Sequence, residues 1–154
     1  MQSTVWFTDL SARPGNSLID KTGALLRAAG IRERTGRGAL TAVKLHFGEK
    51  GNTAFIRPIF VRKVVEEIAA AGGRPFLTDT NTLYVGTRSN AVDHLNTALT
   101  NGFAWAVAGA PLVVADGLRG ESAVRVPIAG KIFREVPIGA EIAHADAMVV
   151  VTHF

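Results

Sequence analysis

Five apolar runs in this chain each end in a polar side chain, and this recurrence constrains the fold more than any other feature. The runs are residues 4–9, 42–46, 75–79, 111–116 and 148–153, which end in Asp9, His46, Asp79, Asp116 and His153. Patterns typical of helices lie between most of them, and this alternation favours an α/β fold with a mostly parallel sheet. Ligands of such sheets bind outside the carboxyl ends of the strands. We therefore predict that the five end residues lie close together.

Three amphipathic patterns predict the main helices, and we expect helices on both faces of the sheet. The first begins at Asn16 or Ser17 and ends at Gly30. The clearest begins at Pro58 and stops at the glycine pair 72–73, because proline suits the first turn and glycine the end of a helix. The third covers residues 91–101, and residues 31–38 are expected to form a loop.

The C-terminal third departs from this alternation. Residues 123–138 alternate in polarity around residues 129–130, which predicts a β-hairpin insertion, followed by a short helix over 139–146. The last apolar run is a further expected strand, and a strand buried on both faces normally needs a neighbouring element. We therefore expect an incomplete C-terminal edge of the sheet, in a chain that is the front part of a longer architecture or whose last strand is covered by a partner.

Composition narrows the functional classes. The 154 residues suit a single domain, 1–154, and the absence of cysteine means that no iron–sulfur cluster, disulfide or thiolate metal site can form on this chain. No apolar stretch reaches the roughly 18 residues of a membrane span, and the first residues lack the charged region and long apolar stretch typical of a signal peptide, so we expect a cytoplasmic protein without a membrane partner. The net charge of +4 favours a small anionic ligand, whereas the scattered basic residues argue against nucleic acid. A homo-oligomer remains open.

Two polar segments carry the candidate chemistry. The loop after His46 combines glycines with polar side chains ahead of a helix, an arrangement that can admit an anion close to the backbone; its candidates are Gly48, Glu49, Lys50, Gly51 and Asn52. At the end of the next strand, Asp79 and the three residues after it are all small and polar, where a turn needs one or two such residues. Here Asp79, Asn81 and Asp116 could bind a cation or hydroxyl, and Tyr84 and Arg88 could close over a ligand.

A divalent metal is the second interpretation of the same residues. Asp79, Asp116, His46 and His153 all end predicted strands, and carboxylates with imidazoles form metal or acid–base sites. For every one of these candidates, a turn, a cap or a surface position is the structural alternative. The spacing alone does not identify a catalytic residue, a substrate or a metal.

Four motifs give the chain a resemblance to a known family. They are Lys44-Leu-His-Phe-Gly-Glu49, Pro75-Phe-Leu-Thr-Asp-Thr-Asn-Thr-Leu-Tyr84, Asp116-Gly117 and Val151-Thr-His-Phe154. With them the whole chain resembles the bacterial and archaeal family called domain of unknown function 362, often described as iron–sulfur or ferredoxin-like. The resemblance implies that this chain corresponds to the N-terminal half of such proteins, whose later cysteine-rich module holds iron–sulfur clusters. It implies a redox context and does not supply a reaction.

Two functions are therefore open. In the first, the strand-end residues bind a small anion or a metal in a domain linked to redox chemistry, with Lys50 or Arg88 holding a carboxylate or phosphate. In the second, the chain is a non-catalytic binding or assembly domain whose last strand docks a partner subunit or an iron–sulfur module, and the polar residues are mainly caps and turns.

Overall fold

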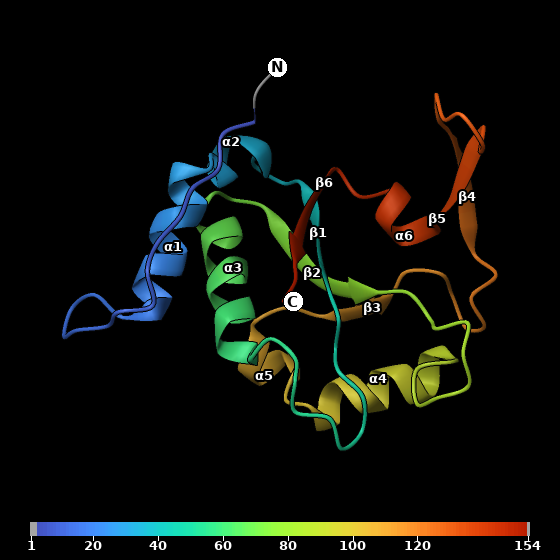
Figure 1. Ribbon diagram of the computed structural model, residues 1–154, viewed down its shortest axis with the longest axis horizontal. Coiled ribbons are helices and arrows are strands. Elements are labelled where there is room, and N and C mark those ends of the chain that lie inside the picture. The colour runs from blue at the N-terminus through green and yellow to red at the C-terminus, as the bar shows by residue number, and fades with distance from the viewer. Residues whose placement is uncertain (1–2, 154) are drawn as a thin grey trace.

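The computed structural model describes residues 3–153 and has a mixed α/β fold with a parallel sheet at its centre. The sheet has the order β3-β2-β1-β6, formed by β1 (Leu40–Leu45), β2 (Arg74–Asp79), β3 (Leu112–Val114) and β6 (Ala147–Val151) (Figure 1). All neighbouring pairs in this sheet are parallel. The α/β class and the mostly parallel sheet are therefore confirmed.

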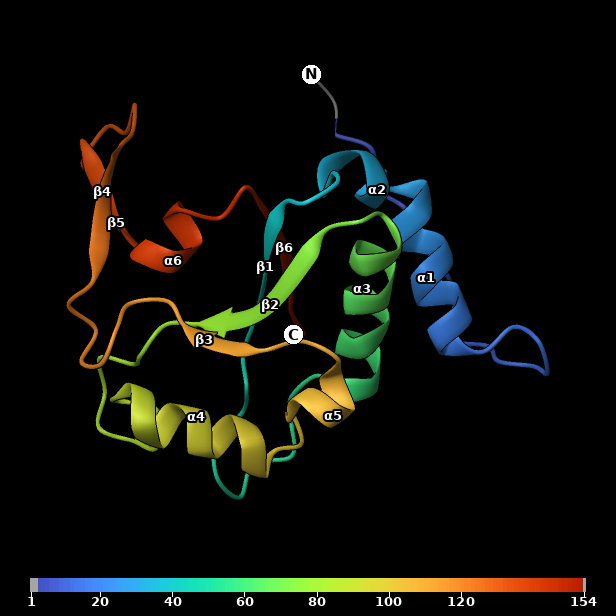
Figure 2. The same ribbon diagram turned by 180° about the vertical axis from the view of Figure 1, so that it is seen from behind.

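A separate β-hairpin consists of β4 (Ala123–Pro127) and β5 (Glu135–Gly139), which pair antiparallel. The two strands project from the body of the molecule beyond α6 (Ala140–Ala143), as both ribbon views show (Figure 2). The hairpin and the short helix after it agree with the sequence prediction.

The longer helices cover one side of the sheet and its carboxyl ends. They are α1 (Leu18–Ala28), α3 (Pro58–Ala70) and α4 (Ala91–Thr100). In Figure 1, α1 and α3 lie on one side of the sheet, α4 lies below the strand ends, and α6 lies on the other side. Two one-turn helices, α2 (Ile31–Arg34) and α5 (Trp105–Ala108), were not predicted, since a single turn has no periodicity to reveal it. The loop expected over residues 31–38 is therefore wrong for its first half, which forms α2.

The core lies between the sheet and α3. Its fully buried members include Val43, Leu45, Val61, Ile68 and Leu77. In β6, Val149 and Val151 pack against this core, whereas Met148 and Val150, which alternate with them, remain half exposed, because side chains of a strand alternate between its two faces. The face of β6 directed away from α1 and α3 is thus only partly covered.

A buried carboxylate joins α1, α2 and α3. Glu67 of α3 is 3% exposed and pairs with Arg27 of α1, with Lys63 at 3.0 Å and with Arg32 of α2 at 3.6 Å. Gly23 permits this approach, since a Cβ there would lie 2.5 Å from Lys63 Cε and 2.9 Å from Glu67 Oε1. Burial alone would raise the pKa of Glu67, but the three cations lower it below its usual value.

Substitution of Glu67 should measure how much its ion pairs contribute to the stability of the fold. We expect Glu67→Gln to lower the free energy of unfolding by about 2 kcal/mol, because breaking a buried ion pair leaves a polar group without its partner, while the partly exposed arginines recover hydration. The neighbouring Glu66 is half exposed, so Glu66→Gln should change the free energy of unfolding by less than about 0.5 kcal/mol. Urea denaturation of both variants makes the comparison, and equal effects would contradict the assignment.

One predicted strand is wrong. Residues 4–9 pair with no strand, and Val5 and Phe7 are 85% and 88% exposed. The run follows α1 instead of the sheet, because the Asp9 carboxylate bonds to Ser11 and pairs with Lys21 of α1. Asp9 therefore does not belong to the row of strand ends.

None of the helices in residues 3–153 is long and apolar enough to cross a membrane.

Candidate functional site

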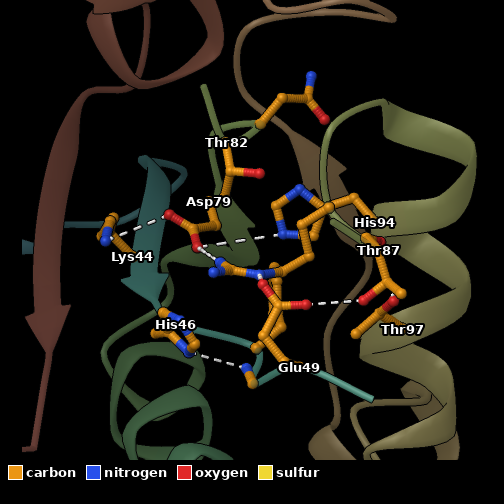
Figure 3. A network of polar contacts seen from close by, with 12 residues as sticks. Lys44, His46, Glu49, Asp79, Thr82, Thr87, His94 and Thr97 are labelled. Atoms are coloured by element: carbon orange, nitrogen blue, oxygen red, sulfur yellow. Dashed lines mark hydrogen bonds and ion pairs between the residues drawn. The ribbon is translucent and has the colours of Figure 1, made fainter. Parts of the chain in front are cut away.

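A network of charged side chains lies at the carboxyl ends of β1 and β2 (Figure 3). At its centre is Asp79, the last residue of β2, which is 5% exposed. Its Oδ1 lies 3.2 Å from Lys44 Nζ, and its Oδ2 lies 3.1 Å from Arg88 Nη1. One buried carboxylate thus holds two cations that come from β1 and from the loop before α4.

Arg88 connects Asp79 to the loop after β1. Its Nε donates to Glu49 Oε1 at 2.8 Å and its Nη2 donates to the Tyr84 hydroxyl at 2.7 Å. Glu49 also accepts from Tyr84 at 2.8 Å and from Thr87 Oγ1 at 2.7 Å. Arg88 is 3% exposed, so its guanidinium is occupied within the protein.

The surroundings of Glu49 favour its charged form. Burial alone would raise its pKa, but the donors Thr87, Arg88 and Tyr84 together lower the pKa to about 2. Burial also opposes the charge on Arg88, and Glu49 outweighs it, so the pKa of Arg88 rises above its ordinary value. Both partners therefore remain ionised at neutral pH.

His46 is oriented by its own loop. Its Nδ1 accepts the backbone N–H of Gly48 at 2.9 Å, so the neutral ring carries its proton on Nε2. Gly48 has φ +83°, and a Cβ there would lie 2.6 Å from Phe55 Cδ1 and 2.7 Å from Asn101 Nδ2, so only glycine fits this turn. Burial, followed by the nearby Arg88, lowers the pKa of His46. At neutral pH the ring is therefore an uncharged donor.

His94 lies beneath the network, on the first turn of α4. It is fully buried, packs edge-on against Phe47, and its Nε2 lies 4.0 Å from Asp79 Oδ2. Within residues 3–153 neither of its ring nitrogens has a hydrogen-bond partner. Burial is the largest cause that lowers the pKa of His94, and it outweighs the attraction of Asp79.

Asn81 and Asp116 form a second group beside the first. The Asp116 carboxylate accepts from the Asn81 backbone N–H at 3.0 Å and from Asn81 Nδ2 at 2.9 Å, and Nδ2 also donates to Gly117 O at 2.8 Å. These contacts join the loops after β2 and β3. Asn81 Oδ1 is buried and has no hydrogen-bond partner among residues 3–153.

The structure brings part of the predicted set together. Five predicted residues make or border the network, namely His46, Glu49, Asp79, Tyr84 and Arg88. Lys50, Gly51 and Asn52 are exposed on the loop, where Asn52 Oδ1 accepts the Ala54 N–H at 2.7 Å in a local turn. His153 is exposed after β6.

The metal interpretation stays a prediction. Asp79 is already paired with Lys44 and Arg88, Asp116 accepts three N–H contacts from Asn81, and His46 Nδ1 is occupied. Residues 3–153 contain no group of three or more His, Asp or Glu side chains placed to hold a metal ion. A cation at Asp79 would have to displace two bound side chains.

Two members of the network were not singled out from the sequence. Lys44 precedes His46 by two positions, and since side chains of a strand alternate, this spacing puts both on the same face. Figure 3 shows them on the same side of Asp79. His94 lies within the helical pattern of residues 91–101, which is typical of a surface or packing residue, and its place beside Asp79 depends on how α4 packs.

Comparison with known proteins gives one finding. The sequence model of the family described as Domain of unknown function (DUF362) matches residues 41–154, so the chain belongs to this family. The match includes the strands, apart from the first residue of β1, and the whole network around Asp79. No curated protein and no solved structure matches the chain significantly.

Proposed function

We propose that this member of the DUF362 family binds a small oxyanion, such as a carboxylate or a phosphate, at the carboxyl ends of β1 and β2. Lys44 and His46 would bind it. The observation that carries this proposal is that, among the residues of the charged network, these two neighbouring side chains are partly exposed and can donate hydrogen bonds to a ligand. Lys44 has 36% of its side chain exposed, and His46 is partly exposed with a protonated Nε2.

The hydrogen-bonding capacity of the two side chains supports an acceptor ligand. An ammonium group has three N–H donors, and Asp79 is the one ion-pair partner of Lys44 among residues 3–153. Nε2–H of His46 adds a neutral donor beside them. Oxygens of a carboxylate or phosphate accept several such bonds at once, and the bonds are strengthened by charge.

The remaining charged residues position this pair. Asp79 holds Lys44, and Arg88 and Glu49 hold Asp79 and the loop that carries His46. Two cations and two carboxylates balance each other in this group, so an incoming anion meets no net negative charge from them. Arg88, expected to hold the ligand, acts here as a positioning residue, because its buried guanidinium already donates to Glu49, Asp79 and Tyr84.

A redox role is a proposal that rests on the family resemblance alone. An iron–sulfur cluster needs thiolate ligands, and this chain has no cysteine. The cluster therefore does not fit the residues present, and no step of a reaction is derived through it.

Removal of the Lys44 charge should weaken anion binding selectively. We expect inorganic phosphate to bind the wild type, and Lys44→Met to raise the dissociation constant at least tenfold, because a hydrogen bond to a charged group is worth about 1.5–3 kcal/mol. Isothermal titration calorimetry at constant ionic strength, with chloride as the balancing salt, measures the effect.

Lys50→Met is the matched control, since it removes the same charge from the adjoining loop. Lys50 is exposed, so its variant should bind phosphate like the wild type. His46→Phe should also weaken binding, because it removes the Nε2 donor and keeps a ring of similar size. If the two lysine variants lose affinity equally, the attraction is a general surface effect and the proposed site is wrong.

A further inference from the structure

We propose that the site formed by Lys44 and His46 takes a monoanion of the carboxylate class and discriminates against dianions such as sulfate or a phosphate monoester. This inference rests on the proposed function, because it concerns the ligand of the same site. It follows from the charges around the two donors, from the distance between Lys44 and a fixed carboxylate, and from the bonds that nearby donors already make within the protein.

The charges around the two donors cancel before a ligand arrives. Lys44 and Arg88 carry two positive charges, and they are paired with the carboxylates of Asp79 and Glu49. Burial is the largest cause of the lowered pKa of His46, and the charged groups that act on this ring are the same four. The neutral ring adds no charge of its own. A single negative charge on the ligand is therefore the excess charge of the whole group, and a dianion would double this excess.

Asp79 stays close to any oxygen that Lys44 binds. Lys44 Nζ lies 3.2 Å from Asp79 Oδ1. A charge-assisted hydrogen bond from Nζ to a ligand oxygen would measure about 2.8 Å, so this oxygen lies within about 6 Å of the Asp79 carboxylate. Asp79 is 5% exposed and is also held by Arg88, which fixes it at this distance. Each negative charge on a ligand is therefore repelled by Asp79 while it is attracted by Lys44.

The charge of a ligand affects the cost and the gain of binding differently. The cost of withdrawing an ion from water grows with the square of its charge, whereas its attraction to fixed charges grows in proportion to the charge. A dianion therefore loses about four times the hydration free energy of a monoanion of the same size and gains about twice the attraction. At a group whose own charges cancel, this difference favours the monoanion.

The kinds of donor that proteins use to bind phosphate are already engaged at this site. They are the planar fork of an arginine and the backbone N–H groups of a glycine loop. The Arg88 guanidinium donates to Glu49 and Asp79, and the Gly48 N–H donates to His46 Nδ1 at 2.9 Å. The two side chains of the site supply the remaining N–H donors, and these match the two oxygens of one carboxylate.

Two anions of the same tetrahedral shape separate the effect of charge from that of shape. Sulfate carries two negative charges and methanesulfonate carries one, and neither charge changes near neutral pH. We expect methanesulfonate and acetate to bind the wild type, and sulfate to have a dissociation constant at least tenfold higher than that of methanesulfonate. Isothermal titration calorimetry at neutral pH, with chloride holding the ionic strength constant, measures the dissociation constants.

Asp79→Asn tests the cause of this discrimination. The substitution removes one negative charge and keeps the size of the side chain, so sulfate should gain more affinity than methanesulfonate, and the ratio of their dissociation constants should fall at least threefold. Asp93→Asn is the matched control: Asp93 is exposed on α4 and binds Asn90, so the same change there should leave the ratio as it is in the wild type. The wild-type comparison needs no substitution and tests the proposal by itself if Asp79→Asn does not fold.

The possible results distinguish this inference from the proposed function. If sulfate binds the wild type as tightly as methanesulfonate, and Lys44→Met weakens both, the selectivity for monoanions is overturned and the anion site stands. If none of the three anions binds, or if Lys44→Met leaves their binding unchanged, both are overturned. A ratio that Asp79→Asn leaves unchanged, or that Asp93→Asn lowers equally, would also overturn the inference, because the selectivity would then not come from the charges of this group.

Discussion

Replacing Arg88 with methionine is expected to lower the free energy of unfolding by about 4 kcal/mol, because it removes the shared cation of two carboxylates and leaves the buried Asp79 with Lys44 alone. Arg88 pairs with Asp79 and Glu49, and the side chains of Arg88 and Asp79 are only 4% and 7% exposed. Methionine fills much of the same space and removes every donor. Urea denaturation at neutral pH measures the change.

The hairpin offers a matched control for this experiment. Arg125 pairs with Glu135, but these side chains are 74% and 49% exposed. Arg125→Met should therefore change the free energy of unfolding by less than about 1 kcal/mol. Arg88→Lys should fall between the wild type and Arg88→Met, since it keeps the charge and loses the planar fork of donors. A loss in Arg88→Met no larger than that in Arg125→Met would show that the network does not hold the strand ends.

Acid is expected to destabilise the protein, and His94 should account for much of the effect. In the unfolded chain this histidine titrates near 6.5, and burial lowers its pKa in the folded protein. Between these two values the unfolded state binds more protons, so stability is unaffected above about pH 6.5 and falls as the pH decreases below it. The loss is about 1.4 kcal/mol for each pH unit until the folded pKa is reached.

Charges around His94 act in both directions. Asp79, Asp116 and Glu49 favour protonation, and Arg88 opposes it together with burial. His46 contributes a dependence of the same sign, because burial lowers its pKa as well. Glu49 acts in a separate window: its contribution is present above about pH 4.5 and is lost as the pH falls towards about 2.

His94→Leu should flatten the pH dependence below pH 6.5 and raise stability there, because the apolar side chain has no proton to gain and leaves no buried nitrogen unpaired. Urea denaturation from pH 7 to pH 5 makes the comparison. The same substitution at His144, which is exposed at the end of α6, should leave the wild-type profile intact. If His94→Leu keeps the full acid dependence, another group is responsible for it.

Local sequence signals predicted the elements that they encode directly. Ser17 caps α1 through a capping box, Pro58 begins α3, and the alternation around residues 129–130 predicted the hairpin. The run over residues 4–9 has the same apolar character as the true strands, yet it forms none. A strand also needs a neighbour, and no pattern within six residues shows where the neighbour lies.

The residues at the strand ends show the same contrast between what the local sequence predicts and what the tertiary contacts decide. The sequence by itself determined that Asp79, His46 and Glu49 lie where strands end, since a change from apolar to polar residues is local. Only the tertiary structure decided that Arg88 forms ion pairs with two carboxylates and that Lys44 is the cation left partly exposed. It also decided that His94 is buried next to Asp79. These outcomes depend on the strand order β3-β2-β1-β6 and on the packing of α4, which bring segments distant in sequence into contact. The energies of contacts between such segments cannot be inferred from the sequence of either segment alone.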